Sequence, residues 1–295
     1  MSTFLDLPDA PLDDADVVLV SLPWEGAVSY GRGSASAPNA IWRASTQIEL
    51  WDQETDTDLE SIAIHNAPTI EPAHDESVDH YLARVEQAVT QFHASERFVV
   101  GVGGDHSLTP ALLRAACAAR EVHGTELTVL HIDAHADLRD EYDGTKNSHA
   151  CAMARAIDLG TTVISIGIRS EEREGHDHGV ASGRVHTYRA RDLHQDPALH
   201  DRLDAALDAI TGPLYVTIDV DALEVHLCPA TGTPEPGGLS WWTTLAILRR
   251  AIRNTNATLI GADVVETVPM SESTVNEDVG ARLVTKLIAY AIARD

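Results

Sequence analysis

Short apolar runs alternate along this chain with longer amphipathic segments. The runs at residues 16–21, 98–102, 127–133, 162–168, 214–218 and 258–263 have the length and composition of buried strands. Between them, apolar positions recur every three or four residues, which predicts helices at residues 77–94, 110–122, 197–210, 241–253 and 276–293, the fourth capped by Ser240. This alternation favours an α/β fold of three layers, with a central, mostly parallel sheet of about eight strands and helices on both faces.

Acidic and histidine side chains close the apolar run at residues 127–133. Asp133, His135 and Asp137 are spaced two residues apart, and in an extended backbone such residues point the same way. Two carboxylates and an imidazole on one face are costly to hold together unless a positive charge lies between them. A divalent metal ion is the expected source of that charge.

Two further runs end in residues of the same kind. The run at residues 98–102 continues into Gly103 and Gly104, which permit a tight turn, and then reaches His106. The run at residues 214–218 continues into Asp219 and Asp221. A single such motif is usually no more than a turn. Because active sites of open parallel α/β sheets lie beyond the carboxyl ends of the strands, we expect these three segments to meet there.

The expected ligand set predicts a pair of metal ions. It consists of two imidazoles and four carboxylates, from His106, His135, Asp133, Asp137, Asp219 and Asp221. This set exceeds the needs of one tetrahedral zinc site, and no cysteine joins it. Carboxylate-dominated ligation with some nitrogen favours two Mn(II) ions, with Fe, Co or Ni as alternatives. Paired metals about 3.5–4 Å apart generate hydroxide at neutral pH and stabilise a hydrolytic transition state.

The amino-acid composition limits the classes of molecule that the chain is expected to bind. The chain has 46 acidic and 21 basic residues, for a net charge of -25, which disfavours nucleic acid and anionic membranes and would attract a cationic substrate. Surface acid also confers solubility, and adaptation to high salt is a third interpretation. The sequence contains no apolar stretch of transmembrane length, no signal peptide, no linker and no paired cysteine spacing. We therefore expect one domain over residues 1–295 and a cytoplasmic protein.

The three motifs resemble the metal motifs of the ureohydrolases, the family of arginase and agmatinase. The matching stretches are residues 103–107, 133–137, and 219–223 with 233–238. Residues 22–33 with 37–38 are similar to the family's glycine-rich loop, residues 166–169 to its central strand, and residues 261–266 to its late strand. The resemblance spans roughly residues 16–293 and is greatest to agmatinase. It implies an arginase-like fold, hydrolysis of a small cationic guanidino substrate to urea and an amine, and a homo-oligomer, either trimer or hexamer.

The resemblance also implies a role for each candidate residue. One Mn(II) would be held by His106, Asp133, Asp137 and Asp219. The other would be held by Asp133, His135, Asp219 and Asp221, so that Asp133 and Asp219 bridge. His149 matches the family's mobile histidine, which serves as acid or proton shuttle, and Glu266 matches the carboxylate that binds the guanidinium group. These roles make chemical sense, because a bidentate carboxylate suits a planar cation and histidine can supply a proton near neutral pH.

Two departures from the family pattern leave the ligand set intact. Glu224 and Val225 stand where the family usually has Asp and Pro, and Ala150 stands where many relatives have glycine. A non-catalytic relative that keeps the fold for binding would be expected to have lost metal ligands. Deacetylases of similar fold use a different, mononuclear ligand set. An active amidinohydrolase is therefore the favoured interpretation.

Agmatine, cleaved to putrescine and urea in polyamine biosynthesis, is the expected substrate. Residues 28–33 and 166–170 look more like agmatinases, and an acidic protein attracts a dication more than a zwitterion. Thr145 and Asn147 partly keep the arginase pattern before His149. Arginine therefore stays an alternative, as do 4-guanidinobutyrate and other guanidino compounds.

Overall fold

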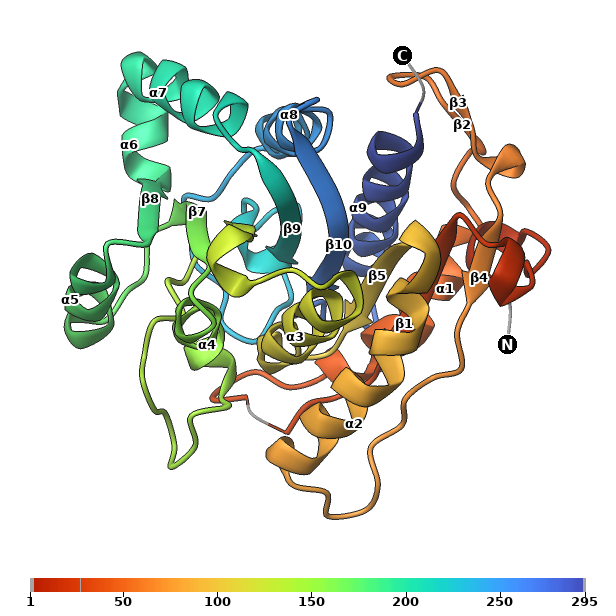
Figure 1. Cartoon of the computed structure of the whole chain (residues 1–295), viewed down its shortest axis with the longest axis horizontal. Helices are drawn as coiled ribbons and strands as arrows, with labels where there is room; N and C mark the ends of the chain where they lie inside the picture. Colours follow the sequence, from red (N-terminus) through yellow and green to blue (C-terminus); the bar gives the residue numbers. More distant parts are fainter. Residues whose placement is uncertain (1–2, 27, 294–295) are drawn as a thin grey trace.

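Eight parallel strands form the central sheet of the computed structural model, which describes residues 3–26 and 28–293 (Figure 1). Their order is β4-β1-β5-β10-β9-β6-β7-β8. The bounds are β1 Val17–Leu22, β4 Ile64–Asn66, β5 Phe98–Gly103, β6 Thr128–Ile132, β7 Thr162–Ile168, β8 Val185–Arg189, β9 Gly212–Asp219 and β10 Ala257–Val265. Two short strands, β2 Trp51–Asp52 and β3 Thr57–Asp58, form a separate antiparallel pair. The predicted parallel sheet of about eight strands is confirmed.

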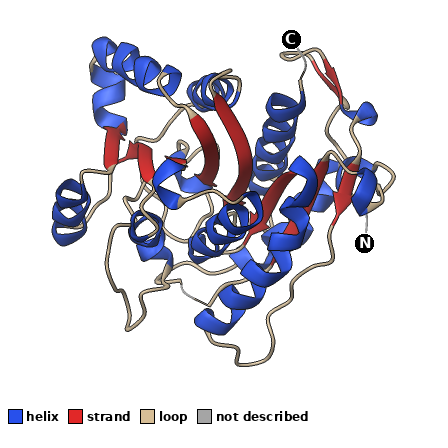
Figure 2. Cartoon of the chain, viewed as in Figure 1, coloured by secondary structure: helices blue, strands red, loops and turns tan. Residues whose placement is uncertain are grey.

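Helices cover both faces of the sheet because successive strand residues point to opposite sides (Figure 2). Val17 and Leu19 of β1 enter one apolar cluster, and Val18 and Val20 enter the other. The first cluster includes residues of α1 Ala37–Ser45, α6 Ala190–Gln195, α7 Pro197–Asp208, α8 Trp241–Ile252 and α9 Val275–Ile292. The second includes residues of α2 Val78–Thr90, α3 Thr109–Arg120 and α4 Ala152–Asp158, and α5 Arg173–Ser182 packs beside α4 and β8.

The five predicted helices are present, with one change of type. The segment predicted as a helix over residues 77–94 leaves the α conformation after Thr90 and continues as a 3-10 helix, Gln91–Glu96. Ser240 caps α8 as predicted, because its Oγ accepts a hydrogen bond of 3.1 Å from the Thr243 amide. Within the described residues, no helix is long and apolar enough to cross a membrane.

Gly103 and Gly104, at the end of β5, allow close packing that a side chain would prevent. Neither Gly103 nor Gly104 has a positive φ. A Cβ at Gly104 would instead lie 1.7 Å from the carbonyl oxygen of Trp24, because the segment after β1 runs against the segment after β5. The Asp105 amide donates to that same oxygen at 2.9 Å. This contact fixes the start of the segment that carries His106.

Candidate active site

His106 is the centre of one group of expected ligands. It opens the 3-10 helix His106–Leu108 after β5 and is completely buried. Its Nδ1 lies 3.1 Å from Asp133 Oδ2, 3.1 Å from Asp137 Oδ2 and 3.5 Å from Asp219 Oδ2. The structure therefore brings together the four side chains that the resemblance assigned to the first metal ion.

His135 forms the second group together with two of the aspartates. Its Nδ1 lies 2.9 Å from Asp221 Oδ2 and 3.7 Å from Asp133 Oδ1. Asp221 is held in place by the Ala134 amide, which donates to its Oδ1 at 3.0 Å, and its own amide donates to Asp219 Oδ1 at 2.9 Å. Asp133 contacts both histidines, which is the placement that a bridging carboxylate requires.

A bulge in β7 lets the Asp133 backbone approach its neighbouring strand. The register between β7 and β8 shifts between Ile166 and Ile168, where Gly167 has a φ of +98°. A Cβ at Gly167 would lie 2.9 Å from the Asp133 carbonyl oxygen, so glycine is needed here. Arg169 then donates to the carbonyl oxygens of Asp221, at 2.7 Å, and Glu235, at 2.6 Å. This arginine ties the two segments that follow β9 to the end of β7.

Three buried polar atoms of the cluster have no hydrogen-bond partner, although buried polar groups in proteins normally have one. They are His106 Nδ1, Asp221 Oδ2 and Glu266 Oε2. The first two lie close to further metal-capable groups, but without good hydrogen-bond geometry. Nitrogen and carboxylate atoms grouped in this way are the ligands that Mn(II) and similar ions accept. The residues therefore fit a pair of divalent metal ions.

The electrostatics of the cluster show that positive charge is needed. Burial opposes a charged His135, but the adjacent carboxylates of Asp133 and Asp221 outweigh it and raise the pKa of His135 to about 12. Burial, together with the charges of Asp221 and Asp133, raises the pKa of Asp219 well above its ordinary value. Without a cation, protons held by His135 and Asp219 thus offset part of the negative charge of the cluster. A metal ion would displace these protons on binding.

Glu266 and His149 lie together beside the metal-capable groups. Glu266 follows β10 directly, and its Oε1 accepts a hydrogen bond of 3.0 Å from the His106 amide. Its Oε2 faces Gly232, where a Cβ would lie 3.1 Å away. His149 Nδ1 lies 3.9 Å from Glu266 Oε1, and its Nε2 lies 3.1 Å from Ser29 Oγ. Ser29 belongs to the glycine-rich loop, in which Ala27 lies outside the described residues.

The surroundings of Glu266 favour a cationic partner. Burial raises the pKa of Glu266 well above its ordinary value, and the nearby charge of Asp105 adds to that increase. A carboxylate in such a place is costly to ionise by itself. A buried cation at its unpartnered oxygen would offset that cost and stabilise the ionised form.

His131 contacts the cluster, although it was not among the residues predicted for the site. Its Nε2 lies 2.8 Å from Asp133 Oδ2, and its Nδ1 lies 3.0 Å from Ser165 Oγ. The signal was present in the sequence, because His131 precedes Asp133 by two residues and therefore shares its strand face. It orients the carboxylate that both groups of ligands share.

A small hollow of about 150 Å³ adjoins the metal-capable cluster. Its walls include His135 and Asp137, together with Arg139 and Glu172. Arg139 lies 4.9 Å from the centre of the Tyr142 ring and 3.9 Å from Glu172 Oε2. The segment after Arg169 thus reaches the metal-capable cluster.

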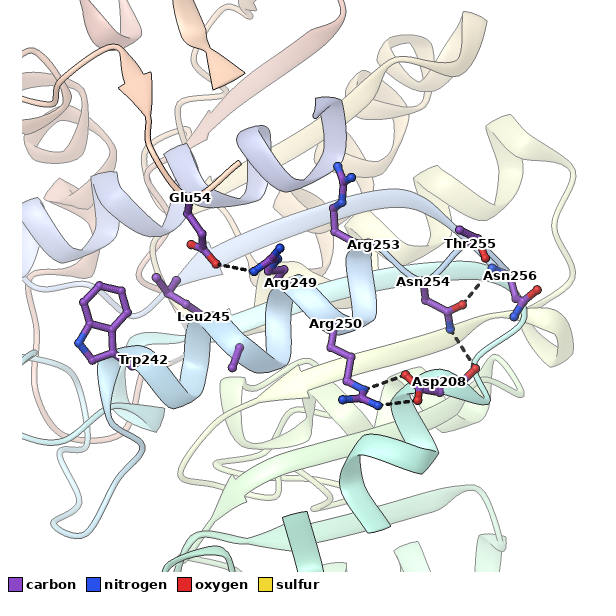
Figure 3. Close-up of a pocket in the computed structure, with 11 residues that line it drawn as sticks. Glu54, Asp208, Trp242, Leu245, Arg249, Arg250, Arg253, Asn254, Thr255 and Asn256 are labelled. Atoms are coloured by element: carbon purple, nitrogen blue, oxygen red, sulfur yellow. Dashed lines mark hydrogen bonds and ion pairs between the residues drawn. The ribbon is translucent and has the colours of Figure 1, made fainter. Parts of the chain in front are cut away.

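A wider hollow of about 630 Å³ lies elsewhere, along α8 and the turn that follows it (Figure 3). None of the expected metal ligands lines it. Two of its arginines are paired with acids: Arg250 contacts Asp208 at 2.6 Å and Arg249 lies 3.6 Å from Glu54. The metal-capable cluster lies at the carboxyl ends of the strands, and this hollow is a separate feature of the surface.

Comparison with known proteins finds similarity over nearly the whole chain. Residues 15–292 match the arginase family. The N(1)-aminopropylagmatine ureohydrolase of Synechocystis sp. is 32% identical, over 94% of this chain and 89% of that protein. The agmatinase of Pyrococcus horikoshii is 29% identical, over 89% of this chain and 87% of that protein. The solved agmatine ureohydrolase of Thermoplasma volcanium superposes with a TM-score of 0.86 at 26% identity, covering 99% of this chain and 94% of that one.

Proposed function

Since this chain belongs to the arginase family and is a hydrolase of C–N bonds, we propose that it uses two Mn(II) ions to cleave a guanidino-amine to urea and an amine. The observation that carries this proposal is the convergence of three buried atoms without partners, His106 Nδ1, Asp221 Oδ2 and Glu266 Oε2. Two metal ions and a planar cation would satisfy all three.

The two ions would share Asp133 and Asp219. One ion would be held by His106, Asp133, Asp137 and Asp219. The other would be held by His135, Asp133, Asp219 and Asp221. When bound, such a pair lowers the pKa of a coordinated water, so that a nucleophile is available near neutral pH. The short distances from each histidine to its aspartates support this division.

Glu266 and His149 would act on the substrate itself. The Glu266 carboxylate would accept two hydrogen bonds from the guanidinium group and so orient its central carbon. His149 would then donate a proton to the leaving amine. Its Nδ1 lies 3.9 Å from Glu266 Oε1, next to the place where the guanidinium would lie, and Ser29 holds the other ring nitrogen.

Agmatine is the substrate that we propose, and N(1)-aminopropylagmatine is the second candidate. The relatives include agmatinases and three N(1)-aminopropylagmatine ureohydrolases, which are 32% to 34% identical to this chain. Neither of these substrates carries a carboxylate. Arg139 is the arginine beside the small hollow, and it is already engaged by Glu172 and Tyr142. This arrangement disfavours recognition of the carboxylate of arginine or 4-guanidinobutyrate.

A comparison of four substrates tests this proposal. We expect the Mn(II)-loaded enzyme to release urea from agmatine or its aminopropyl derivative with a kcat/KM at least tenfold above that for arginine or 4-guanidinobutyrate. Tenfold corresponds to about 1.4 kcal/mol of transition-state preference. If arginine or guanidinobutyrate were preferred by tenfold, the assignment to guanidino-amines would be wrong. If no guanidine released urea, the proposed activity itself would be wrong.

We further propose a cytoplasmic homo-oligomer, a trimer or hexamer. Trp51 and Trp242 support assembly, because they are 59% and 72% exposed and line one hollow at the β2–β3 pair. Exposed aromatic side chains are enriched at protein interfaces. Trp24 and Trp42, in contrast, are buried in the core.

A further inference from the structure

A chain of hydrogen bonds leads from His106 away from the site and into the sheet. His106 Nε2 lies 2.9 Å from Thr217 Oγ1, and Thr217 Oγ1 donates to Asp263 Oδ1 at 2.6 Å. Thr217 of β9 and Asp263 of β10 are register partners in adjacent strands. All three side chains are completely buried. The contact is therefore rigid and shielded from water.

Asp263 is surrounded by hydroxyl groups that donate to it. Its Oδ2 accepts hydrogen bonds from Tyr215, at 2.9 Å, and from Thr109, at 3.1 Å. A threonine hydroxyl has a single hydrogen. Because the hydrogen of Thr217 lies in the 2.6 Å bond to Asp263, the Thr217 oxygen can only accept from His106. His106 must then carry its proton on Nε2.

The position of that proton decides what the other ring nitrogen can do. A neutral imidazole has one protonated and one unprotonated nitrogen, so a proton on Nε2 leaves a lone pair on Nδ1. Nδ1 is the atom that faces Asp133, Asp137 and Asp219. It is also one of the buried atoms without a hydrogen-bond partner. This chain of hydrogen bonds from His106 through Thr217 to Asp263, hereafter the relay, thus leaves a metal-binding lone pair on Nδ1 that points at the carboxylates.

We propose that Asp263, acting through Thr217, fixes the tautomer of His106 and thereby sets the affinity of the protein for one of its two metal ions. Asp263 is a positioning residue, because it contacts His106 only through the Thr217 hydroxyl. His135 has Asp133 and Asp221 as its partners and lies outside the relay. The second ion is therefore independent of Asp263. This inference rests on the proposed function in requiring that two ions bind.

Titration of the metal-free protein with Mn(II), with free Mn(II) followed by electron paramagnetic resonance, tests the relay. Thr217→Val removes the acceptor of the His106 proton with little change of shape. We expect it to lower the affinity for one of the two ions by ten- to a hundredfold, the usual effect of losing the partner of a ligating histidine. Thr217→Ser restores the hydroxyl and is expected to restore the affinity. Tyr215→Phe removes a different hydrogen-bond donor to Asp263 and is expected to leave the affinities for both ions near those of the wild type.

Asp263→Asn provides an independent test, and it decides the question should Thr217→Val not fold. We expect it to lower the affinity for the same ion by about tenfold. An amide cannot accept hydrogen bonds from the hydroxyls of Thr217, Tyr215 and Thr109 together. The double variant should bind that ion no more weakly than Thr217→Val alone, since both changes interrupt one path.

The outcomes separate this inference from the function on which it rests. A wild-type protein that takes up no Mn(II) would contradict the proposed function. A wild type with two ions, together with Thr217→Val and Asp263→Asn variants that retain both affinities, would overturn the relay alone. An equal loss of affinity for both ions, with a lower melting temperature of the metal-free protein, would show that these residues have a merely structural role. That result would also overturn the relay.

Discussion

Glu266 and Asp137 hold left-handed backbone conformations, with φ of +62° and +51°. Such a conformation costs a residue with a side chain about 1–2 kcal/mol, so the surroundings must enforce it. At Glu266 the amide donates to the Gly104 carbonyl at 2.8 Å, and the side chain accepts from the His106 amide. Both contacts come from the segment after β5. They turn the Glu266 carboxylate back over the cluster, where the proposed guanidinium would lie.

His149 is expected to matter for the rate more than for binding. His149→Asn should lower kcat by about a hundredfold with a smaller change in KM, because proton delivery to the leaving amine is needed mainly in the transition state. Steady-state urea release measures both constants. Ser29→Ala is the matched control: it removes only the contact at Nε2 and should cost a few-fold in kcat. Wild-type kcat in His149→Asn would remove this histidine from the mechanism.

Residues at strand ends could be predicted from the sequence, whereas residues inside strands could not. Asp133, His135, Asp219 and Asp221 break apolar runs at a spacing of two, which is a local signal. Thr217 lies inside its run, and Asp263, the last residue of the run at residues 258–263, has no acidic residue or histidine two positions away. Their pairing exists only through the register of β9 and β10, which no local pattern encodes.

At the scale of elements, the central strands were predictable and the edge strands were not. β5, β9 and β10 are buried on both faces and therefore form apolar runs in the sequence. β8 is half-exposed along its length and β4 has only three residues, so neither produces such a run. The β2–β3 pair is shorter still. What a strand is packed against determines whether its sequence reveals it.

The segment after β1 packs so closely against the segment after β5 that we expect Gly104 not to tolerate replacement by a residue with a side chain. A Cβ at Gly104 would lie 1.7 Å from a backbone oxygen of Trp24, so Gly104→Ala must displace the main chain before His106. We expect a loss of about 2 kcal/mol of unfolding free energy, typical of overpacking, together with a loss of activity.

Gly144→Ala is the control for the glycine prediction. A Cβ at Gly144 would have no atom within 4 Å, and the φ of this residue is +78°, so its replacement costs only left-handed strain, about 1 kcal/mol. Thermal or denaturant unfolding of both variants compares them. Equal and small effects would show that the approach of the two segments is not tight.

The charge of the whole molecule predicts stabilisation by salt. At a net charge of -25 the folded chain repels itself, and 1 M salt reduces the Debye length to about 3 Å. Salt also weakens exposed ion pairs such as Arg250 with Asp208, but exposed pairs of this kind contribute little. We therefore expect the melting temperature to rise from low to molar KCl. An unchanged or lower melting temperature would leave solubility as the reason for the acidity.

Activity as a function of bound metal tests the central claim most directly. Metal-free protein is loaded with increasing Mn(II), bound Mn(II) per chain is measured, and urea release from agmatine is followed in the same samples. Activity should rise as the second ion binds. Asp133→Asn removes a charge that both His106 and His135 contact, and it should lower the rate of urea release at least about a hundredfold. Near-normal urea release with one ion or none per chain, in the wild type or in Asp133→Asn, would contradict the two-metal account.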